Sequence, residues 1–160
     1  VQFYRVAENL PVSQILADDE SGAEQVTEYL IQKGCRRIAI LLGSKGLSIS
    51  QKRFIGYQNI LQKHQLKIDE KLIVHCDFTL GKVVKAVDSW LKIKPGIDAI
   101  ISISDKSAVQ IIRHLKEKKV HVPGKIRVFG FGNEFVGEIV DRISAITSSF
   151  ISKALTRLMG

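Results

Sequence analysis

Two patterns of apolar and polar positions take turns along this chain, short apolar runs and apolar residues at helical spacing. Their alternation predicts strands separated by helices. Short apolar runs of the length of buried strands occupy residues 12–18, 36–43, 71–78, 98–104 and 125–131. Apolar residues spaced three or four positions apart, as on one face of a helix, fill residues 21–34, 48–65, 81–93 and 105–119. Strand and helix therefore succeed one another with connections of only a few residues.

Successive strand-helix units of this kind predict an α/β fold with a doubly wound, parallel, right-handed sheet in which the five strands lie side by side. The stretch from Ile38 to Leu42 is apolar at every position, which is typical of a strand covered on both faces. In such sheets a ligand binds beyond the carboxyl ends of the strands. The residues of functional interest are therefore those directly after Leu42, Cys76, Ile103 and Phe131.

A polar pair, Ser104 and Asp105, stands at one of these positions, where an apolar run passes directly into a helical pattern. A helix start needs a hydrogen-bond acceptor, and a binding cleft needs donors and acceptors along its wall. Asp105 is expected to cap its helix, and this role is compatible with ligand contact. For the helix 21–34 we expect Ser21 as the N-cap and Gly34 as the glycine that ends the helix.

Length and composition predict one soluble globular domain, because 160 residues with 45% hydrophobic content can bury a core of their own. No apolar run approaches the roughly 20 residues that span a bilayer, and no signal-peptide pattern begins at Val1. Cys35 and Cys76 form neither a metal-binding spacing nor a disulfide framework, which favours a reducing compartment. We therefore expect a cytoplasmic protein without a membrane partner.

The chain carries 24 Lys and Arg against 16 Asp and Glu, a formal net charge of +8. A basic balance of this size raises the question of nucleic-acid binding. The basic residues are spread along the chain with few aromatic residues among them, which favours solvated helix faces over direct DNA contact. The four histidines stand apart from one another and indicate neither a metal site nor a catalytic triad.

Three stretches in a fixed order resemble a known family. SGAEQVTEYLIQKGCRRIAILLG (21–43) opens a helix with Gly-Ala, ends it with Leu-Ile-x-x-Gly and continues with a basic pair and Ile-Ala. SQKRFIGYQNIL (50–61) contains Arg-x-x-Gly-Tyr. Residues 95–134 contain Asp-Ala-Ile, a polar residue before Asp-x-x-Ala, and Val-Pro-x-x-Ile-x-Val-x-Gly-Phe. Together these features resemble the effector-binding core of the LacI/GalR family of bacterial transcriptional regulators.

The resemblance implies a periplasmic binding protein-like fold of type I, in which two similar lobes hold a ligand between them. It assigns residues 1–34 to part of the first lobe, 35–142 to the second lobe, and 143–160 to the crossover segment. It also implies a homodimer. On the same basis the DNA-binding helix-turn-helix domain is absent from this sequence, so the chain is expected to be a fragment that does not bind an operator alone.

Arg53 matches the family arginine that hydrogen-bonds sugar hydroxyls, and its planar guanidinium offers several donors at once. A surface arginine is the alternative. Phe78 stands where the family often places an aromatic ring against the sugar, with a core position at a strand end as the alternative. For Asp77 we expect capping of the following helix rather than ligand contact.

Ser104 and Asp105 stand where the family usually has Asn-Asp, and the shorter Ser104 reaches only a close ligand hydroxyl. In GFGNE (130–134), Gly132 occupies the place where many relatives carry an aspartate. Asn133 is then the remaining candidate there, because its amide both donates and accepts hydrogen bonds.

Asp18 to Ser21 face the cleft if the resemblance holds, and Asp19 or Ser21 is expected to touch the ligand. Helix capping is the alternative for both residues, because acidic and hydroxyl side chains favour helix starts. We expect no metal and no cofactor.

The function predicted from these features is that of an effector-sensing domain, with a sugar or related small polar molecule as ligand. Ligand binding would close the lobes and change how the missing domain holds DNA. A periplasmic sugar-binding protein of an uptake system is the alternative, because it shares the fold. An enzyme is not expected, since LLGSKGLS (41–48) lacks the end of a phosphate loop and no nucleophile elbow is present.

Overall fold

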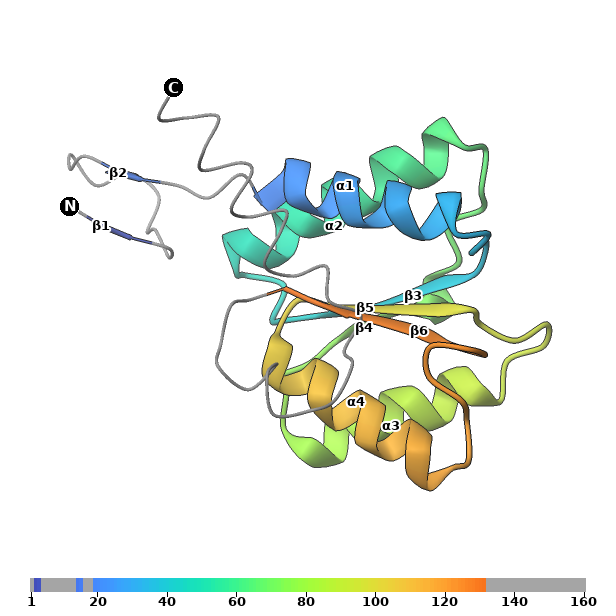
Figure 1. Cartoon of the computed structure of the whole chain (residues 1–160). Coiled ribbons are helices and arrows are strands. Elements are labelled where there is room, and N and C mark those ends of the chain that lie inside the picture. The colour runs from blue at the N-terminus through green and yellow to red at the C-terminus, as the bar shows by residue number, and fades with distance from the viewer. Residues whose placement is uncertain (1, 4–13, 16–18, 132–160) are drawn as a thin grey trace.

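The structure is a computed structural model that describes residues 2–3, 14–15 and 19–131 (Figure 1). Asn133 and the predicted crossover segment 143–160 lie outside these residues. At the centre is a four-stranded sheet with the order β4-β3-β5-β6. The strands are β3 (Ile38–Leu42), β4 (Ile73–His75), β5 (Ala99–Ser102) and β6 (Arg127–Gly130).

All three pairings in this sheet are parallel, which confirms the parallel α/β architecture predicted from the alternation of strands and helices. The placement of the first predicted strand beside the others is wrong. The part of that run which forms a strand, β2 (Gln14–Ile15), pairs in parallel with β1 (Gln2–Phe3) in a separate two-stranded sheet. Four of the five predicted strands therefore share one sheet.

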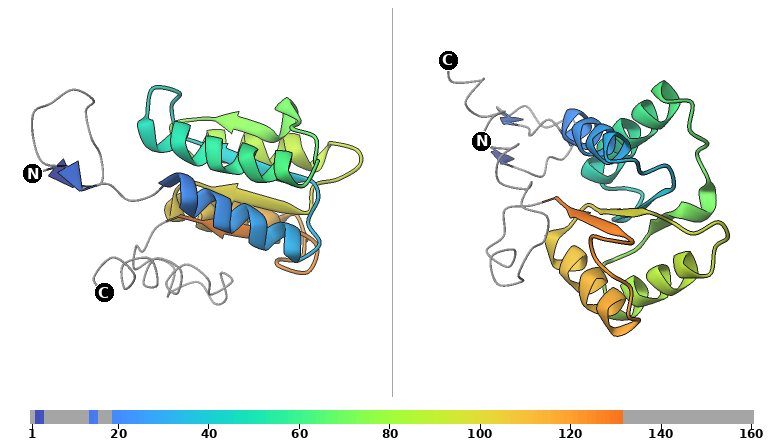
Figure 2. Two further views of the ribbon diagram at one scale, coloured as in Figure 1. Left: turned by 90° about the horizontal axis from the view of Figure 1, so that it is seen from above. Right: turned by 45° about the vertical axis from the view of Figure 1, so that its right-hand side comes forward.

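Helices cover both faces of the four-stranded sheet. One face carries α1 (Asp19–Gln32) and α2 (Ser48–Lys63), and the other carries α3 (Leu80–Leu91) and α4 (Asp105–Glu117), as Figures 1 and 2 show from three sides. A short 3₁₀ helix, η1 (Glu70–Leu72), leads into β4. This arrangement explains why β3 is apolar at every position, because all five of its residues are buried between the two helix layers.

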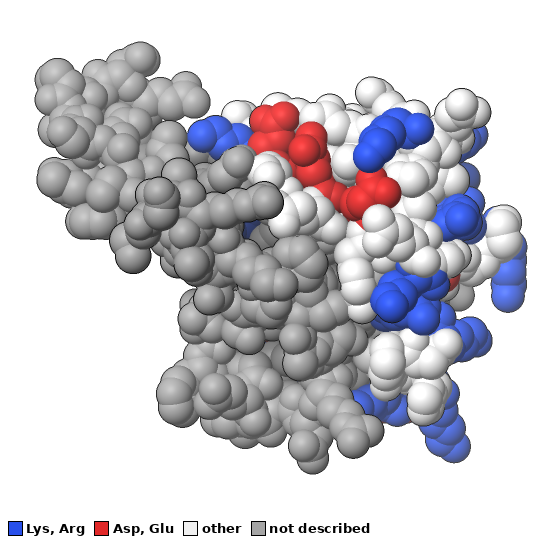
Figure 3. All heavy atoms as spheres, turned by 45° about the horizontal axis from the view of Figure 1, so that its top comes forward, with Lys and Arg blue, Asp and Glu red and all other residues white. Residues whose placement is uncertain are grey.

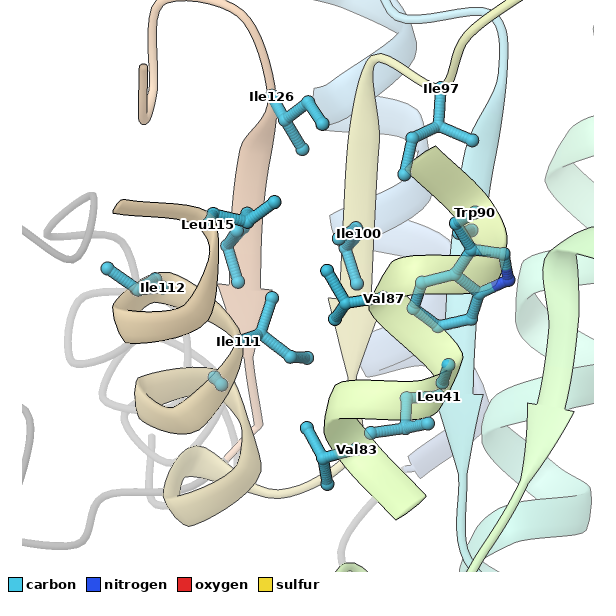
Figure 4. Close-up of a cluster of buried hydrophobic side chains, with 14 of the residues drawn as sticks. Leu41, Val83, Val87, Trp90, Ile97, Ile100, Ile111, Ile112, Leu115 and Ile126 are labelled. Atoms are coloured by element: carbon cyan, nitrogen blue, oxygen red, sulfur yellow. The ribbon is translucent and has the colours of Figure 1, made fainter. Parts of the chain in front are cut away.

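Each helix layer packs on its own hydrophobic cluster. Beneath α3 and α4, Trp90, Val87 and Leu115 are fully buried against Leu41 and Ile100 of the sheet (Figure 4). The cluster beneath α1 and α2 is built in the same way from side chains of the opposite sheet face, including Leu30, Tyr57, Ile40, Leu42 and Ile101. Successive residues of β3 therefore serve the two clusters in turn.

Helix α1 approaches α2 closely, and Gly56 allows this approach. A Cβ at position 56 would lie 2.2 Å from the backbone oxygen of Glu20 and 3.0 Å from the Cβ of Ala23. α1 thus packs on the same sheet as the other helices. The lobe division at residue 34 stays a prediction, and this packing argues for a boundary ahead of Asp19.

The order of the strands reverses between β3 and β5. From β3 the chain passes through α2 to β4 on one side, then returns through α3 to β5 on the other side. At such a switch point the connections leaving two neighbouring strands diverge, and a crevice forms at their carboxyl ends. The fold therefore directs attention to the residues after Leu42 and Ser102.

Candidate functional site

The carboxyl ends of the four strands bring most of the predicted site residues to one edge of the sheet. β3 ends at Leu42 and β5 at Ser102, and these two strands are neighbours at the switch point. The residues that follow them, Gly43 after β3 and residues 103–104 after β5, begin the connections to α2 and α4. Arg53 reaches this edge from α2, and Asp19 reaches it from the first position of α1.

Arg53 is the most fully engaged polar side chain of the site. Its Nε donates to Oδ1 of Asp19 over 2.9 Å, its Nη2 donates to the same oxygen over 2.7 Å, and its Nη1 donates to the backbone oxygen of Ile103 over 2.9 Å. The arginine is only 5% exposed. Arg53 therefore lies at the carboxyl edge of the sheet, and its expected alternative as a surface side chain is wrong. Ligand contact by Arg53 stays a prediction.

An aromatic ring covers the Arg53 guanidinium. The carbon at its centre lies 4.3 Å from the centroid of the Phe131 ring, which in turn packs edge-on against Phe129 at 5.4 Å. Stacking of this kind attracts a cation through the negative face of the ring. Phe131 is the first residue after β6, and the apolar pattern of the sequence identified it only as the end of a predicted strand. The Gly-Phe pair of the sequence motif, formed by Gly130 and Phe131, could have drawn attention to this ring.

Phe78 lies at the same edge with an unusual backbone. Its φ is 59°, a left-handed conformation that is rare for an aromatic residue. The ring is half-buried, contacts both hydrophobic clusters, and lies close to Gly43, where an added Cβ would stand 3.3 Å from Phe78 Cε2. Backbone outliers of this kind are concentrated at functional sites. Ligand contact by Phe78 stays a prediction, and its core contacts are also present.

Asp77 organises the turn before α3. Its Oδ1 accepts hydrogen bonds from the backbone N–H of Thr79 over 3.2 Å and from the Thr79 hydroxyl over 2.9 Å, while Lys82 Nζ lies 2.7 Å from Oδ2. The lysine, followed by the two Thr79 hydrogen bonds, lowers the pKa of Asp77 to about 2. This local role agrees with the expected preference for the helix start, although Thr79 rather than Asp77 is the N-cap residue.

At the polar pair, the cap position differs from the prediction. α4 begins at Asp105, so Ser104 is its N-cap residue and Asp105 is the first helical residue. The Ser104 side chain makes no capping hydrogen bond. A carboxylate in the first turn is still favoured there by the partial positive charge of the helix N-terminus.

Two further serines fix the backbone of Ser104. The hydroxyls of Ser102 and Ser107 lie 2.5 Å apart, and each is also within hydrogen-bond distance of the Ser104 backbone oxygen, at 3.0 and 2.9 Å. Ser102 and Ser107 are both buried and were not among the predicted site residues. The sequence hint to their role was their position on either side of the Ser104-Asp105 pair, one at the end of a strand and one at the start of a helix.

Asp105 is buried against β6. A Cβ at Gly130 would lie 2.6 Å from Asp105 Oδ1 and 2.9 Å from the Cβ of Ala108, so only glycine leaves room for the carboxylate. The Gly-Phe pair of the sequence motif thus places a glycine beside Asp105 and an aromatic ring on Arg53.

Ser21 lies inside α1, in the turn that follows Asp19, so its expected role as N-cap is wrong because the helix begins two residues earlier. Its hydroxyl accepts a hydrogen bond from Gln25 Nε2 over 3.2 Å. Asp19, by contrast, reaches Arg53. Asn133, the last predicted contact residue, lies beyond Phe131 and outside the described residues.

His75 also belongs to this edge, although its isolated position in the sequence gave no reason to select it. It is the last residue of β4, its Nδ1 lies 3.0 Å from the backbone oxygen of Gly43, and its ring meets Phe54 edge-on. Within residues 19–131, no group of three or more His, Cys, Asp or Glu side chains is placed to hold a metal ion. In the same part of the chain, no helix is long and apolar enough to cross a membrane.

Charges on the described surface are distributed unevenly. Figure 3 shows acidic side chains grouped on the face that carries α1 and α2, with basic side chains spread around them. Three glutamates of α1 are spaced four residues apart and contact α2. Glu20 and Glu24 accept hydrogen bonds from Asn59, and Glu28 pairs with Lys63 and His64. The spread of the basic residues gives no continuous basic patch in this view.

Comparison with known proteins places these features in a family context. Residues 27–152 match the sequence profile of a family described as the periplasmic binding protein-like domain. Catabolite control protein A of Staphylococcus xylosus is 32% identical over 129 residues, which cover 81% of this chain and 39% of that protein. The chain thus spans about two fifths of the length of this curated relative.

Solved structures agree with the sequence match. A LacI-family sugar-binding transcriptional regulator from Escherichia coli, complexed with phosphate, superposes with a TM-score of 0.74 at 26% identity, covering 79% of this chain and 46% of that one. A complex of the transcriptional regulator CelR with cellobiose superposes with a TM-score of 0.69 at 32% identity, covering 75% of this chain and 37% of that one. The predicted fold class is therefore confirmed.

Proposed function

Because this chain belongs to the periplasmic binding protein-like domain family, in the form found in LacI-family transcriptional regulators, we propose that it senses a small-molecule effector for such a regulator. The effector is a carbohydrate or a related small polar molecule. Its binding controls operator binding by a separate helix-turn-helix domain. The protein acts in the cytoplasm as a homodimer and catalyses no reaction.

The observation that carries this proposal is the meeting of Arg53, Asp19 and the backbone oxygen of Ile103 at the switch point of the sheet. Polar donors and acceptors on a rigid strand edge, with the aromatic rings of Phe131 and Phe78 beside them, suit a small polyhydroxyl ligand. The cellobiose complex of CelR is a relative with such a ligand.

Control of DNA binding follows from differential affinity. An effector that contacts both this edge and a facing lobe binds the closed arrangement more tightly, and therefore shifts the population toward that arrangement. The Escherichia coli regulator and CelR, whose solved structures superpose on this chain, are both named as transcriptional regulators, which favours this function over the periplasmic uptake protein that shares the fold.

A thermal-shift screen tests the proposal. The protein is heated with neutral mono- and disaccharides, sugar phosphates and nucleosides, each in turn. One ligand class should raise the free energy of unfolding by RT ln(1 + [L]/Kd), about 2.7 kcal/mol at a ligand concentration of 100 Kd. The bound ligand should be recovered unchanged. Absence of stabilisation by every class, or turnover of the bound compound, would contradict the proposal.

A further inference from the structure

The positive charge of Arg53 is already neutralised from within the chain. Nε–H and Nη2–H are the parallel pair of donors with which an arginine forms bidentate hydrogen bonds to an oxyanion. Both of these donors point to Oδ1 of Asp19, at 2.9 and 2.7 Å. The side chains of Arg53 and Asp19 are only 6% and 12% exposed, so solvent screens this ion pair weakly.

The remaining approaches to the guanidinium are restricted. The ring of Phe131 covers one face at 4.3 Å, and the backbone oxygen of Ile103 accepts from Nη1. A phosphate or carboxylate brought to Arg53 would therefore stand beside the Asp19 carboxylate. Like charges held close together in a poorly solvated place repel strongly.

A neutral hydroxyl meets no such repulsion. It accepts a hydrogen bond from a guanidinium N–H and can donate its own hydrogen to a carboxylate oxygen, so that arginine and aspartate together offer it both kinds of partner. The Arg53–Asp19 pair is therefore complementary to a polyhydroxyl ligand and unfavourable to an anion.

We propose that Asp19 is a specificity-determining residue that occupies the oxyanion fork of Arg53 and so restricts the site to uncharged polyhydroxyl ligands. This inference rests on the proposed function, because it takes the carboxyl edge as the effector site. It narrows the effector class by excluding sugar phosphates and sugar acids that would need Arg53 as their counter-ion.

Inorganic phosphate serves as the probe for a direct test. Phosphate is titrated at constant ionic strength into the wild-type chain and into Asp19→Ala, while the Nε–H resonance of Arg53 is followed by ¹⁵N NMR. In the wild type this resonance should not respond to millimolar phosphate. In Asp19→Ala it should shift with saturation, and phosphate should bind at least tenfold more tightly than to the wild type.

Matched variants separate this effect from a general change in charge. Glu20→Ala removes a carboxylate from the next residue, which contacts Asn59 rather than Arg53, and should behave as the wild type does. In the double variant Asp19→Ala with Arg53→Met the reporting resonance is gone, so phosphate affinity is measured by isothermal titration calorimetry in all variants, and the double variant should lose the gain in affinity seen in Asp19→Ala. Asp19→Asn keeps the side-chain shape and is measured in parallel, so that the comparison does not depend on tolerance of the alanine.

A response of wild-type Arg53 to phosphate at the concentrations that saturate the Asp19 variants would overturn the inference. So would variants that fold and gain no affinity for phosphate. Failure of the proposed function is a separate result, because it would show as the absence of stabilisation by every ligand class in the thermal-shift screen and would leave the phosphate comparison readable.

Discussion

Arg53 shows what a charged side chain needs in order to be buried in this chain. The guanidinium loses nearly all of its contact with water and receives in exchange one carboxylate, one backbone oxygen and one aromatic face. Removing one partner of a buried ion pair costs far more than the pair itself contributes, because the other charge is left without compensation. The stability of the site edge therefore depends on both members being present.

Arg53→Met should lower the free energy of unfolding by about 3–5 kcal/mol, because Asp19 keeps its buried charge and loses its partner. Urea denaturation followed by circular dichroism measures the change. Arg37→Met is the matched control. Its partner Asp69 is 3.4 Å away and both side chains are about a quarter exposed, so the loss should be about 0–1 kcal/mol. Equal losses in the two variants would contradict this account.

Gly130→Ala tests the space beside Asp105. The new Cβ would stand 2.6 Å from Asp105 Oδ1 and 2.9 Å from the Cβ of Ala108, so that the start of α4 must move away from β6. Overpacking of this kind should cost about 1–3 kcal/mol in a denaturation experiment. Gly46→Ala serves as the control, since no atom lies within 4 Å of its Cβ position. Identical stability of both variants would exclude the proposed crowding.

At the scale of residues, the sequence predicted which side chains lie at the site edge, but it did not predict which of them contact one another. Arg53 and Asp19 were selected separately, from a motif and from a position before a helix, yet their pairing joins residues 34 positions apart. Such a contact follows from the packing of α1 against α2, which no local pattern contains. The same holds for Phe131, whose ring meets the guanidinium only because β6 lies beside β5.

At the scale of elements, the contact between α1 and α2 sets the shape of the site edge. Gly56 permits the two helices to approach, and the approach carries Asp19 to Arg53. Helix packing distance depends on the side chains at the contact, so a single methyl group at the closest point changes it.

Gly56→Ala should therefore destabilise the chain by about 3 kcal/mol, the upper end of the usual cost of overpacking, because its Cβ would meet a backbone oxygen of α1 at 2.2 Å. Gly81→Ala, also on a helix but with open space at its Cβ, should leave the stability unchanged or raise it by up to about 1 kcal/mol. Thermal unfolding measured by circular dichroism compares the two. A Gly56→Ala variant as stable as wild type would contradict the close approach.

The elements themselves were largely predictable. The bounds of the four helices and of the strands β3 to β6 lie within three residues of the segments chosen by apolar periodicity, because each element buries one face or both. The first apolar run was assigned to the wrong sheet. Strand partners are chosen by the fold as a whole, and an apolar run of a few residues carries no information about its neighbour.

At the scale of the whole molecule, the net charge of +8 favours the charged form of the acidic side chains, and three of them are held in that form by hydrogen bonds. Hydrogen bonds from Lys63 and then His64 lower the pKa of Glu28, and a hydrogen bond from His114 lowers the pKa of Asp88. Lys82 and Thr79 lower the pKa of Asp77 to about 2. All three carboxylates are solvated, so each contributes modestly and salt weakens the contribution.

Stability should therefore fall as the pH is lowered from about 5 to about 2. In this window the unfolded chain takes up protons on Glu28, Asp77 and Asp88 before the folded chain does, because the pKa of each is lower in the folded state. Urea midpoints across this range measure the effect, which should be smaller in 1 M salt and smaller in Asp77→Asn. A midpoint that is constant or rises on acidification would contradict the assignment.

Trp90, the only tryptophan of the chain, is fully buried in the cluster beneath α3 and α4. Its indole Nε1 is buried without a hydrogen-bond partner among the described residues. Selective excitation of this indole therefore reports on the α3–α4 half alone, with short-wavelength emission while that half is intact. An effector bound by Arg53 lies on the other face of the sheet, so it would alter this fluorescence only if its binding displaced the sheet. The emission of Trp90 therefore distinguishes ligand binding without rearrangement from binding that moves the α3–α4 half.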